Sequence, residues 1–161
     1  MRAIPLTTGG VALVDDEDFE RVTQVGPWYA HESLNTSYAK QNYCPEGGRY
    51  TTRSMHNFVT GLRYVDHING NGLDNRRANL RPATASQNQA NQRMRRDNTS
   101  GYRGVQRAPG ERWRALIIVK GKRISLGYYD AREDAARAYD AAAIQFFGEY
   151  ARPNFPRESY A

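Results

Sequence analysis

Apolar and polar positions alternate in short runs along the first third of the chain, and Gly, Pro, Asn and Ser separate these runs. Alternation with a period of two predicts half-buried strands. The expected elements are strands at 10–14 and 37–43, a helix beginning within 15–20, and a helix over 55–60 that ends at Gly61. Residues 1–50 contain no chemical motif, so we interpret them as a small supporting sheet.

The middle of the chain predicts a β-hairpin followed by a helix. A β-type run at 64–68 leads into the turn-forming Asn-Gly-Asn-Gly segment at 69–72, and 79–81 supplies the returning strand. Pro82 limits how far that strand pairs. A helix is expected over 86–91, where Asn88 and Asn91 share a face because they are three residues apart.

The C-terminal third predicts a sheet covered by one helix. In the strand at 112–117, Arg112 and Arg114 alternate with an apolar face; in a second strand at 122–126, Ile124 and Leu126 face inward. Asp130 and Glu133 suggest a capping box at the start of a helix that Gly148 ends. The inward positions are Trp113, Ala115 and Ile117 on the first strand and Ala135, Ala138, Tyr139, Ala142 and Phe146 on the helix.

Charge is unevenly distributed along the 161 residues, whose formal net charge is +6. Residues 1–92 carry nine basic and nine acidic side chains, residues 93–123 carry ten and two, and residues 124–161 carry four and six. A local basic excess is typical of a module that neutralises phosphates. The alternative is a solvated charged face.

Cysteine content and hydropathy exclude other classes of site and location. The lone Cys44 forms no internal disulfide, and a metal would need oxygen or nitrogen ligands. The longest apolar runs are far too short to span a membrane, and the first residues lack a signal-peptide pattern. We therefore expect a soluble, cytoplasmic protein without a membrane partner.

Two segments resemble known families. The run at 65–81, followed by 86–91, resembles the HNH nucleases and is most similar to phage and intron homing endonucleases. The segments 102–105, 113–115, 126–127, 135–140 and 154–156 resemble the AP2 DNA-binding domain. The two resemblances together cover roughly residues 51–156 and imply a phage-encoded enzyme that acts in a bacterial host.

The HNH resemblance implies a ββα-metal site with four matched residues. His67 matches the general base and Asp66 the metal-binding acid. Twelve residues after His67, Asn79 matches the central Asn, and Asn88 matches the last motif position. The resemblance therefore assigns catalysis to His67 and Asn79, and one divalent ion to Asp66 and Asn88.

The chemistry of these side chains fits phosphodiester hydrolysis. A histidine with an ordinary pKa near 6.5 takes a proton from water at neutral pH, and Asn79 is expected to accept from the other ring N–H and fix the tautomer. Asp66 and the Asn88 amide oxygen are hard ligands that favour Mg²⁺ or Mn²⁺. The alternative is that Asp66 and Asn79 are turn residues and His67 a hydrogen-bonded structural histidine.

Further residues around the motif have open roles. His56 contacts phosphate or braces the hairpin, and Asn91 orients a metal water or is a solvated helix residue. Three arginines either grip backbone phosphates or are exposed charges: Arg76, Arg77 and Arg81.

The AP2 resemblance implies a three-stranded sheet in the major groove with a helix behind it. The matching positions on the DNA side are Arg103, Gly104, Arg112, Arg114 and Arg123. The chain departs from the plant pattern at Gln106, Ala108, Gly110, Leu116, Ile118 and Ser125. Base recognition at these positions is therefore open, and contacts to phosphates are the alternative.

Together these observations predict an α+β protein: a nuclease domain with β-rich support at 1–92, a basic linker at 93–100, an AP2-like domain at 101–156 and a tail at 157–161. The expected activity is metal-dependent cleavage of double-stranded DNA to 5′-phosphate and 3′-hydroxyl ends. The alternatives are a non-catalytic AP2-type regulator with an HNH scaffold and a structure-specific or RNA-directed nuclease. Target sequence and oligomeric state stay open.

Overall fold

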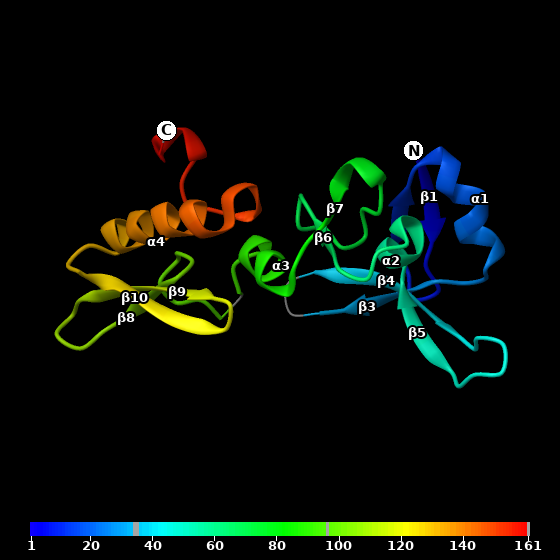
Figure 1. Ribbon diagram of the computed structural model, residues 1–161, viewed down its shortest axis with the longest axis horizontal. Coiled ribbons are helices and arrows are strands. Elements are labelled where there is room, and N and C mark those ends of the chain that lie inside the picture. Colours follow the sequence, from blue (N-terminus) through cyan, green and yellow to red (C-terminus); the bar gives the residue numbers. More distant parts are fainter. Residues whose placement is uncertain (34–35, 96, 161) are drawn as a thin grey trace. The chain divides into compact units, whose positions relative to one another are not determined.

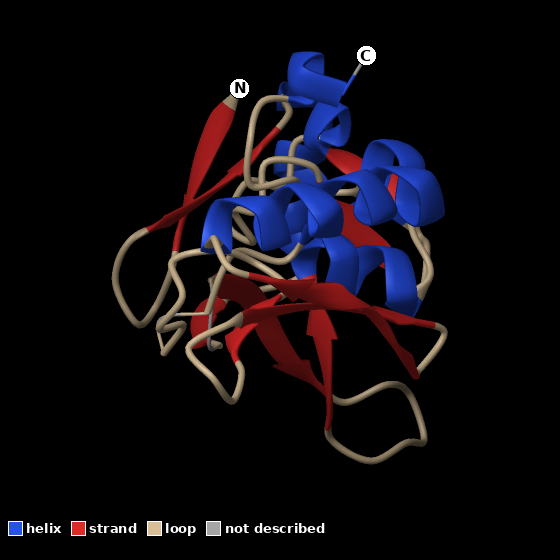
Figure 2. Ribbon diagram, turned by 90° about the vertical axis from the view of Figure 1, so that its left-hand side faces the viewer, coloured by secondary structure: helices blue, strands red, loops and turns tan. Residues whose placement is uncertain are grey.

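A computed structural model describes residues 1–33, 36–95 and 97–160. The chain divides into two compact units, residues 1–84 and 85–161, each of which mixes helices with strands (Figure 1). Figure 2 distinguishes the helices, in blue, from the strands, in red. The sheets are antiparallel, which confirms the expected α+β class. Residue 96, which falls in the expected linker, lies outside the described residues.

The first unit contains two small sheets, a hairpin and two short helices. Its elements are β1 (Arg2–Pro5), β2 (Val11–Val14), α1 (Asp16–Gln24), β3 (Tyr29–Glu32), β4 (Ser37–Tyr43), β5 (Thr51–Ser54), α2 (Met55–Thr60), β6 (Val65–His67), η1 (Arg77–Asn79) and β7 (Leu80–Pro82). β1 pairs with β2, β4 pairs between β3 and β5, and β6 pairs with β7. Trp28, Met55 and Val59 lie at the centre of the core.

The structure confirms the helix predicted at 55–60. α2 ends at Gly61, whose left-handed backbone (φ 71°) allows its N–H to donate to the Asn57 carbonyl. Met55 and Val59, both on α2, are buried in the core. This short helix therefore places His56 on the side of the first unit that carries the β6–β7 hairpin.

The second unit is a three-stranded sheet with one long helix along a face, as Figure 1 shows. Its elements are α3 (Ala85–Asn91), β8 (Val105–Arg107), β9 (Trp113–Val119), β10 (Lys122–Tyr129), α4 (Arg132–Phe147), η2 (Gly148–Tyr150) and η3 (Arg157–Tyr160). Ala115 and Ile117 of β9 are buried against α4. Small alanines on α4 allow this close approach of helix and sheet.

Two local predictions in this unit are wrong, whereas Ile124 faces inward as expected, since it lies opposite the buried Ile117. It is still 36% exposed, because β10 is an edge strand with a neighbour on one side only. Phe146 is exposed and Phe147 is buried instead, because Phe147 continues the buried row of Tyr139 and Ala143 at intervals of four residues. The N-cap of α4 is Ala131, without a side-chain bond, so Asp130 does not cap it.

Membrane-spanning helices are absent from the described parts of the chain: none of the helices there combines sufficient length with sufficient apolar character. Cys44 is exposed and unpaired with another cysteine. Helix α3, at the end of the expected nuclease domain, groups with the second unit. The domain limits at 92/93 and 100/101 remain predictions.

Candidate nuclease site and DNA-binding face

The β6–β7 hairpin carries the two residues at the head of the motif. β6 pairs with β7 in regular register, Asp66 opposite Arg81 and His67 opposite Leu80. All three residues of β6 are buried. Asp66 and His67 thus occupy adjacent positions of one short, buried strand.

His67 lies in a buried pocket of polar neighbours within the first unit. Its Nε2 is 3.4 Å from the Asn75 Oδ1, which fits Nε2–H as the donor and leaves the lone pair on Nδ1. Burial lowers the pKa of His67, and the opposing influence of Asn75, Asp66 and Asp74 is smaller. The ring is therefore neutral near pH 7, the form that accepts a proton.

The rings of His56 and Tyr38 pack against the His67 ring. His56 meets it edge-on at 4.9 Å between centroids, and Tyr38 lies 5.8 Å from it. Burial lowers the pKa of His56 to about 3, so His56 is neutral too. Of the two roles considered for His56, this placement favours the brace for the hairpin.

Asp66 is buried and engaged by its cross-strand partner. Arg81 places Nε and Nη2 each 2.9 Å from the Asp66 Oδ2, and only 2% of Asp66 is exposed. Arg81 offsets the carboxylate charge that this burial would otherwise leave uncompensated. A cation bound at Asp66 would share the carboxylate with Arg81.

Asn79 stabilises the hairpin turn, and its bonds differ from the expected one to His67. Its Oδ1 accepts from the Asn69 N–H at 3.0 Å, and its Nδ2 donates to the Asp74 carbonyl at 2.8 Å. The amide is thus fully used in closing the 69–79 loop. Asn75 faces the His67 ring in its place.

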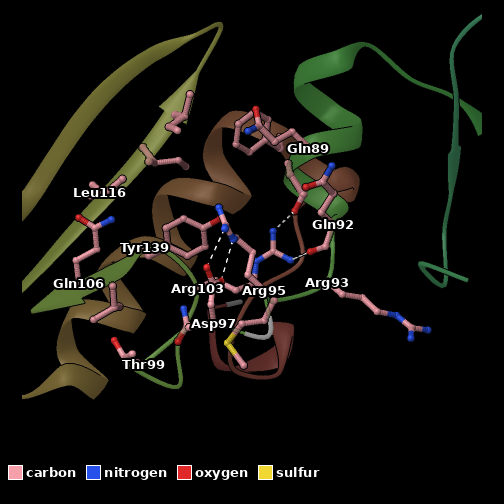
Figure 3. A pocket seen from close by; sticks show the side chains of 18 of the residues that line it. Gln89, Gln92, Arg93, Arg95, Asp97, Thr99, Arg103, Gln106, Leu116 and Tyr139 are labelled. Atoms are coloured by element: carbon pink, nitrogen blue, oxygen red, sulfur yellow. Dashed lines mark hydrogen bonds and ion pairs between the residues drawn. The ribbon is translucent and has the colours of Figure 1, made fainter. Parts of the chain in front are cut away.

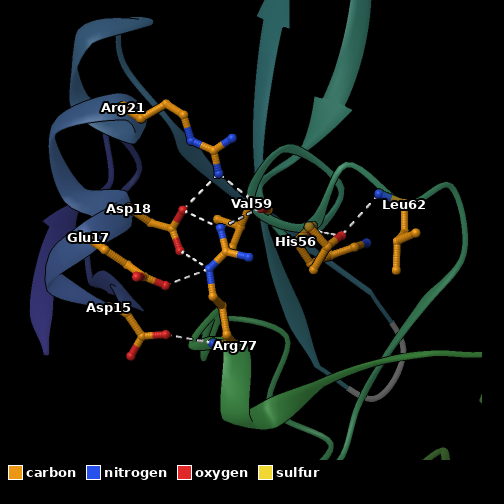
Figure 4. Close-up of polar contacts among 9 residues, drawn as sticks. Asp15, Glu17, Asp18, Arg21, His56, Val59, Leu62 and Arg77 are labelled. Carbon is orange, nitrogen blue, oxygen red and sulfur yellow. Dashed lines mark hydrogen bonds and ion pairs between the residues drawn. The ribbon is translucent and has the colours of Figure 1, made fainter.

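Arg76 and Arg77 are paired with buried carboxylates. Arg76 forms a two-point ion pair with Asp74, at 2.7 Å for each bond. Arg77 binds both oxygens of Asp18 on α1, at 2.8 and 2.9 Å, and its side chain also reaches Glu17 and the Val59 carbonyl (Figure 4). The bonds of Arg77 fasten the loop before β7 to α1 and α2 of the first unit.

Asn75 is the residue that sequence analysis missed. It is completely buried, and its Nδ2 has no hydrogen-bond partner among the residues that the structure describes. Its position within the polar run 74–77 is typical of an exposed turn, which hid it. A polar segment enclosed between a predicted strand and its return was the available signal.

The remaining motif residues lie on α3 in the second unit. Asn88 is half-buried and Asn91 is buried, and both take part in interactions within their surroundings. α3 is only seven residues long. The hairpin and this helix therefore belong to different compact units.

The face of the second unit's sheet that points away from α4 carries the arginines predicted on β9 and β10. Arg114 pairs across the sheet with Gln106 and Tyr128, and Arg123 pairs with Ile118. These positions alternate with the buried Ala115 and Ile117, so they point away from α4. Arg112, just before β9, donates to the Tyr128 carbonyl at 3.0 Å and lies 3.3 Å from Asp130.

Arg103 and Gly104 lie at the entrance to β8. The Arg103 guanidinium donates to carbonyls at the end of α3, of Ala90 and Gln92. Gly104 has φ +70° and lies flat against Tyr139: a Cβ there would be 1.9 Å from the ring. Gly104 thus has a packing role that its sequence match did not indicate.

The side chains expected to bind the metal fit a hard divalent ion better than zinc. Asp66 offers a carboxylate and Asn88 an amide oxygen, whereas zinc prefers thiolate and imidazole ligands. Across the described ranges, no group of three or more His, Cys, Asp or Glu side chains is placed to hold a metal. Phosphate and water oxygens would have to complete the shell.

Comparison with known proteins identifies both halves of the chain. A family model described as HNH endonuclease matches residues 63–90, and a model described as AP2 domain matches residues 100–149. Plant proteins match the second half: an AP2/ERF and B3 domain-containing protein of Oryza sativa subsp. japonica is 41% identical over 76 residues, 47% of this chain and 18% of its own length.

Viral proteins share longer stretches. An uncharacterised HNH endonuclease of Acanthamoeba polyphaga mimivirus is 35% identical over 91 residues, 56% of this chain and 46% of its own length. Protein 3.8 of Escherichia phage T7 is 33% identical over 90 residues, 55% of this chain and 74% of its own length. The chain thus spans less than half of the mimivirus relative and most of the phage protein.

Proposed function

The chain belongs to the HNH endonuclease family and carries an AP2 domain, and from this premise we propose that it is a metal-dependent DNA endonuclease of the homing type. It hydrolyses phosphodiester bonds of double-stranded DNA and leaves 5′-phosphate and 3′-hydroxyl ends. The nuclease motif supplies the reaction and the AP2 domain supplies the attachment to DNA.

The contact of the buried His67 ring with Asn75 is the observation that carries this proposal. The His67 Nε2 faces the Asn75 oxygen at 3.4 Å, so Nδ1 is the proton acceptor. In the proposed step, His67 takes a proton from water as the water oxygen bonds to phosphorus. The bond from phosphorus to the 3′-oxygen breaks, and the departing oxygen takes a proton from solvent.

Asp66 and Asn88 are the ligands that we assign to one Mg²⁺ or Mn²⁺ ion. The ion, when bound, supplies positive charge that stabilises the phosphorane-like transition state and the leaving oxygen. Arg81 orients the Asp66 carboxylate through its two bonds of 2.9 Å. Asn79 acts on the reaction indirectly, because its amide fixes the loop on which Asn75 lies.

Attachment to DNA is assigned to the sheet of the second unit. Arg112, Arg114 and Arg123 are the proposed contacts, in the segment whose basic side chains outnumber acidic ones ten to two. Leu116, Ile118 and Ser125 between them offer no bidentate donors to base edges. We therefore propose binding mainly through phosphates, which makes the affinity strongly dependent on salt.

A cleavage assay on supercoiled plasmid tests the proposed function. The protein is incubated with Mg²⁺, Mn²⁺ or EDTA, and the ends of the products are labelled with and without phosphatase treatment. The proposal predicts nicked or linear DNA only with a divalent ion, with 5′-phosphates and 3′-hydroxyls. Binding without cleavage under every metal condition would instead favour a non-catalytic regulator.

A further inference from the structure

Helix α3 is too short and too polar to be stable without contacts from the surrounding unit. It has seven residues, mostly Ser, Gln and Asn, and isolated helices shorter than about 12 residues are marginal in water. Its only buried apolar side chain is Ala90, which packs in the core cluster that includes Tyr139 and Phe147. The helical form of α3 therefore depends on the AP2-like unit around it.

Arg103 binds the C-terminal end of α3. Its Nη2 donates to the Ala90 carbonyl at 2.6 Å, and its Nη1 donates to the Gln92 carbonyl. The last carbonyls of a helix have no partner within the helix and carry partial negative charge, so a cation placed there stabilises the final turn. Figure 3 shows Arg103 reaching toward Gln92 beside the Arg95–Asp97 ion pair.

The backbone of Arg103 is itself held at both polar groups. Its N–H donates to the Asn154 Oδ1 at 2.7 Å, and its carbonyl accepts from the Asn154 Nδ2 at 3.2 Å. Asn154 is in turn held by the fully buried Asp140 of α4. The guanidinium therefore extends toward α3 from a rigid base in the AP2-like unit.

We infer that Arg103 is a positioning residue of the nuclease: it holds the last turn of α3 and, with it, Asn88. Asn88 lies two residues before Ala90, in the same turn that Arg103 binds. This inference rests on the proposed function, which assigns Asn88 to the metal. The AP2-like unit then contributes to the rate of cleavage as well as to DNA affinity.

The surroundings of Arg103 allow the side chain to be removed without collapse. It lines a cavity of about 470 Å³ together with residues of α3, β8 and β9. Water can therefore enter and solvate the carbonyls of Ala90 and Gln92 in an Arg103→Ala variant. The turn loses its cation while the core formed by Tyr139 and Phe147 stays packed.

Single-turnover cleavage at saturating DNA and metal, with DNA affinity measured separately in EDTA, tests the role. Arg103→Ala is predicted to lower the cleavage rate constant by about tenfold to a hundredfold, since small displacements of a reacting group have effects of this size. Its DNA dissociation constant is predicted to change less than threefold. Arg103→Lys keeps the charge and is predicted to restore part of the rate.

Arg132→Ala is the charge-matched control in the same unit, because Arg132 is the exposed first residue of α4, where it pairs with its neighbour Glu133 and lies over the Tyr102 ring. It is predicted to leave both quantities unchanged. A weaker affinity of Arg103→Ala with an unchanged cleavage rate would overturn the inference and make Arg103 a DNA contact. Absence of cleavage by the unaltered protein would contradict the proposed function instead.

Amide hydrogen exchange across residues 86–92 gives a second measurement that does not depend on activity. Arg103→Ala is predicted to exchange faster there than the unaltered protein, while the amides of β9 and α4 keep their protection. Equal protection of α3 in both proteins would overturn the inference, whatever the nuclease activity. Faster exchange in α3 alone indicates loss of the helix cap, whereas faster exchange in β9 and α4 as well indicates a general loss of folding.

Discussion

The ring of His56 meets the ring of His67 edge-on, with 4.9 Å between their centroids and 89° between their planes. His56 comes from the first turn of α2, a helix fixed by the buried Met55 and Val59. The orientation of the proposed general base is thus linked to the core of the first unit through one imidazole.

Removal of the His56 ring should therefore slow cleavage. His56→Ala leaves a gap behind His67, and we expect a cleavage rate about tenfold lower with a loss of about 2 kcal/mol in folding free energy. His56→Phe keeps a ring edge and should retain most of the rate. Single-turnover kinetics and urea denaturation check both variants, with the exposed His31→Ala as control. Equal cleavage rates for His56→Ala and the unaltered protein would show that His56 does not position His67.

Asn75 should set the pH range in which His67 works. Burial lowers the pKa of His67 below 6.5, so the acid limb of the cleavage rate is expected below pH 6.5. Asn75→Asp places a carboxylate against Nε2, which raises the pKa of His67 and moves the acid limb to higher pH. Rate profiles between pH 5 and 8 measure this, and an unshifted limb would show that Asn75 does not bond to the reacting histidine.

Asp18 joins α1 to the loop before β7 and should stabilise the first unit in a pH-dependent way. Burial raises the pKa of Asp18, but bonds from Arg77 and Arg21 outweigh burial, and the net pKa is lowered. This stabilisation is present above the unfolded pKa near 3.8 and is lost as the pH falls through the lower folded value. Asp18→Asn should cost about 2 kcal/mol at pH 7.

Urea denaturation at pH 7 and at pH below 3.8 tests this linkage. The difference in unfolding free energy between the two proteins should shrink at acid pH, because the protonated Asp18 of the unaltered protein no longer pairs with Arg77. A difference that stays constant over this range would mean that the ion pair adds nothing to stability.

Gly104 should tolerate no side chain. At φ +70°, a Cβ would lie 1.9 Å from a ring carbon of Tyr139, a residue in the core of the second unit. Gly104→Ala is expected to destabilise this unit by about 3 kcal/mol or more and to abolish DNA binding. Gly101 shares a positive φ of 79° but has open space around it, so Gly101→Ala should cost about 1 kcal/mol from backbone strain alone.

Local patterns in the sequence predicted the helices and strands well, but they did not predict which polar side chains are buried. The Gly61 cap, the hairpin of the 64–68 run with residues 79–81, and the alternation of Arg114 with Ala115 follow from neighbouring residues, and the structure contains all three. The burial of Asn75 depends on segments distant in sequence, so periodicity carries no sign of it.

The same distinction holds for the charged residues. Arg76 and Arg77 resemble phosphate contacts in sequence, yet Asp74 and Asp18 engage them at 2.7–2.9 Å. The pairing of Arg77 with Asp18 spans 59 positions of the chain. A partner as distant as Asp18 emerges only from tertiary packing, as does the bond between Arg103 and the end of α3.

Single-turnover cleavage by His67→Ala, compared with the unaltered protein at saturating Mg²⁺ and DNA, tests the central claim most directly. Removal of a general base should lower the rate constant by about 10²-fold to 10⁴-fold, while the DNA dissociation constant measured in EDTA stays within threefold. Cleavage by His67→Ala at the rate of the unaltered protein would contradict the assignment of His67 as the base.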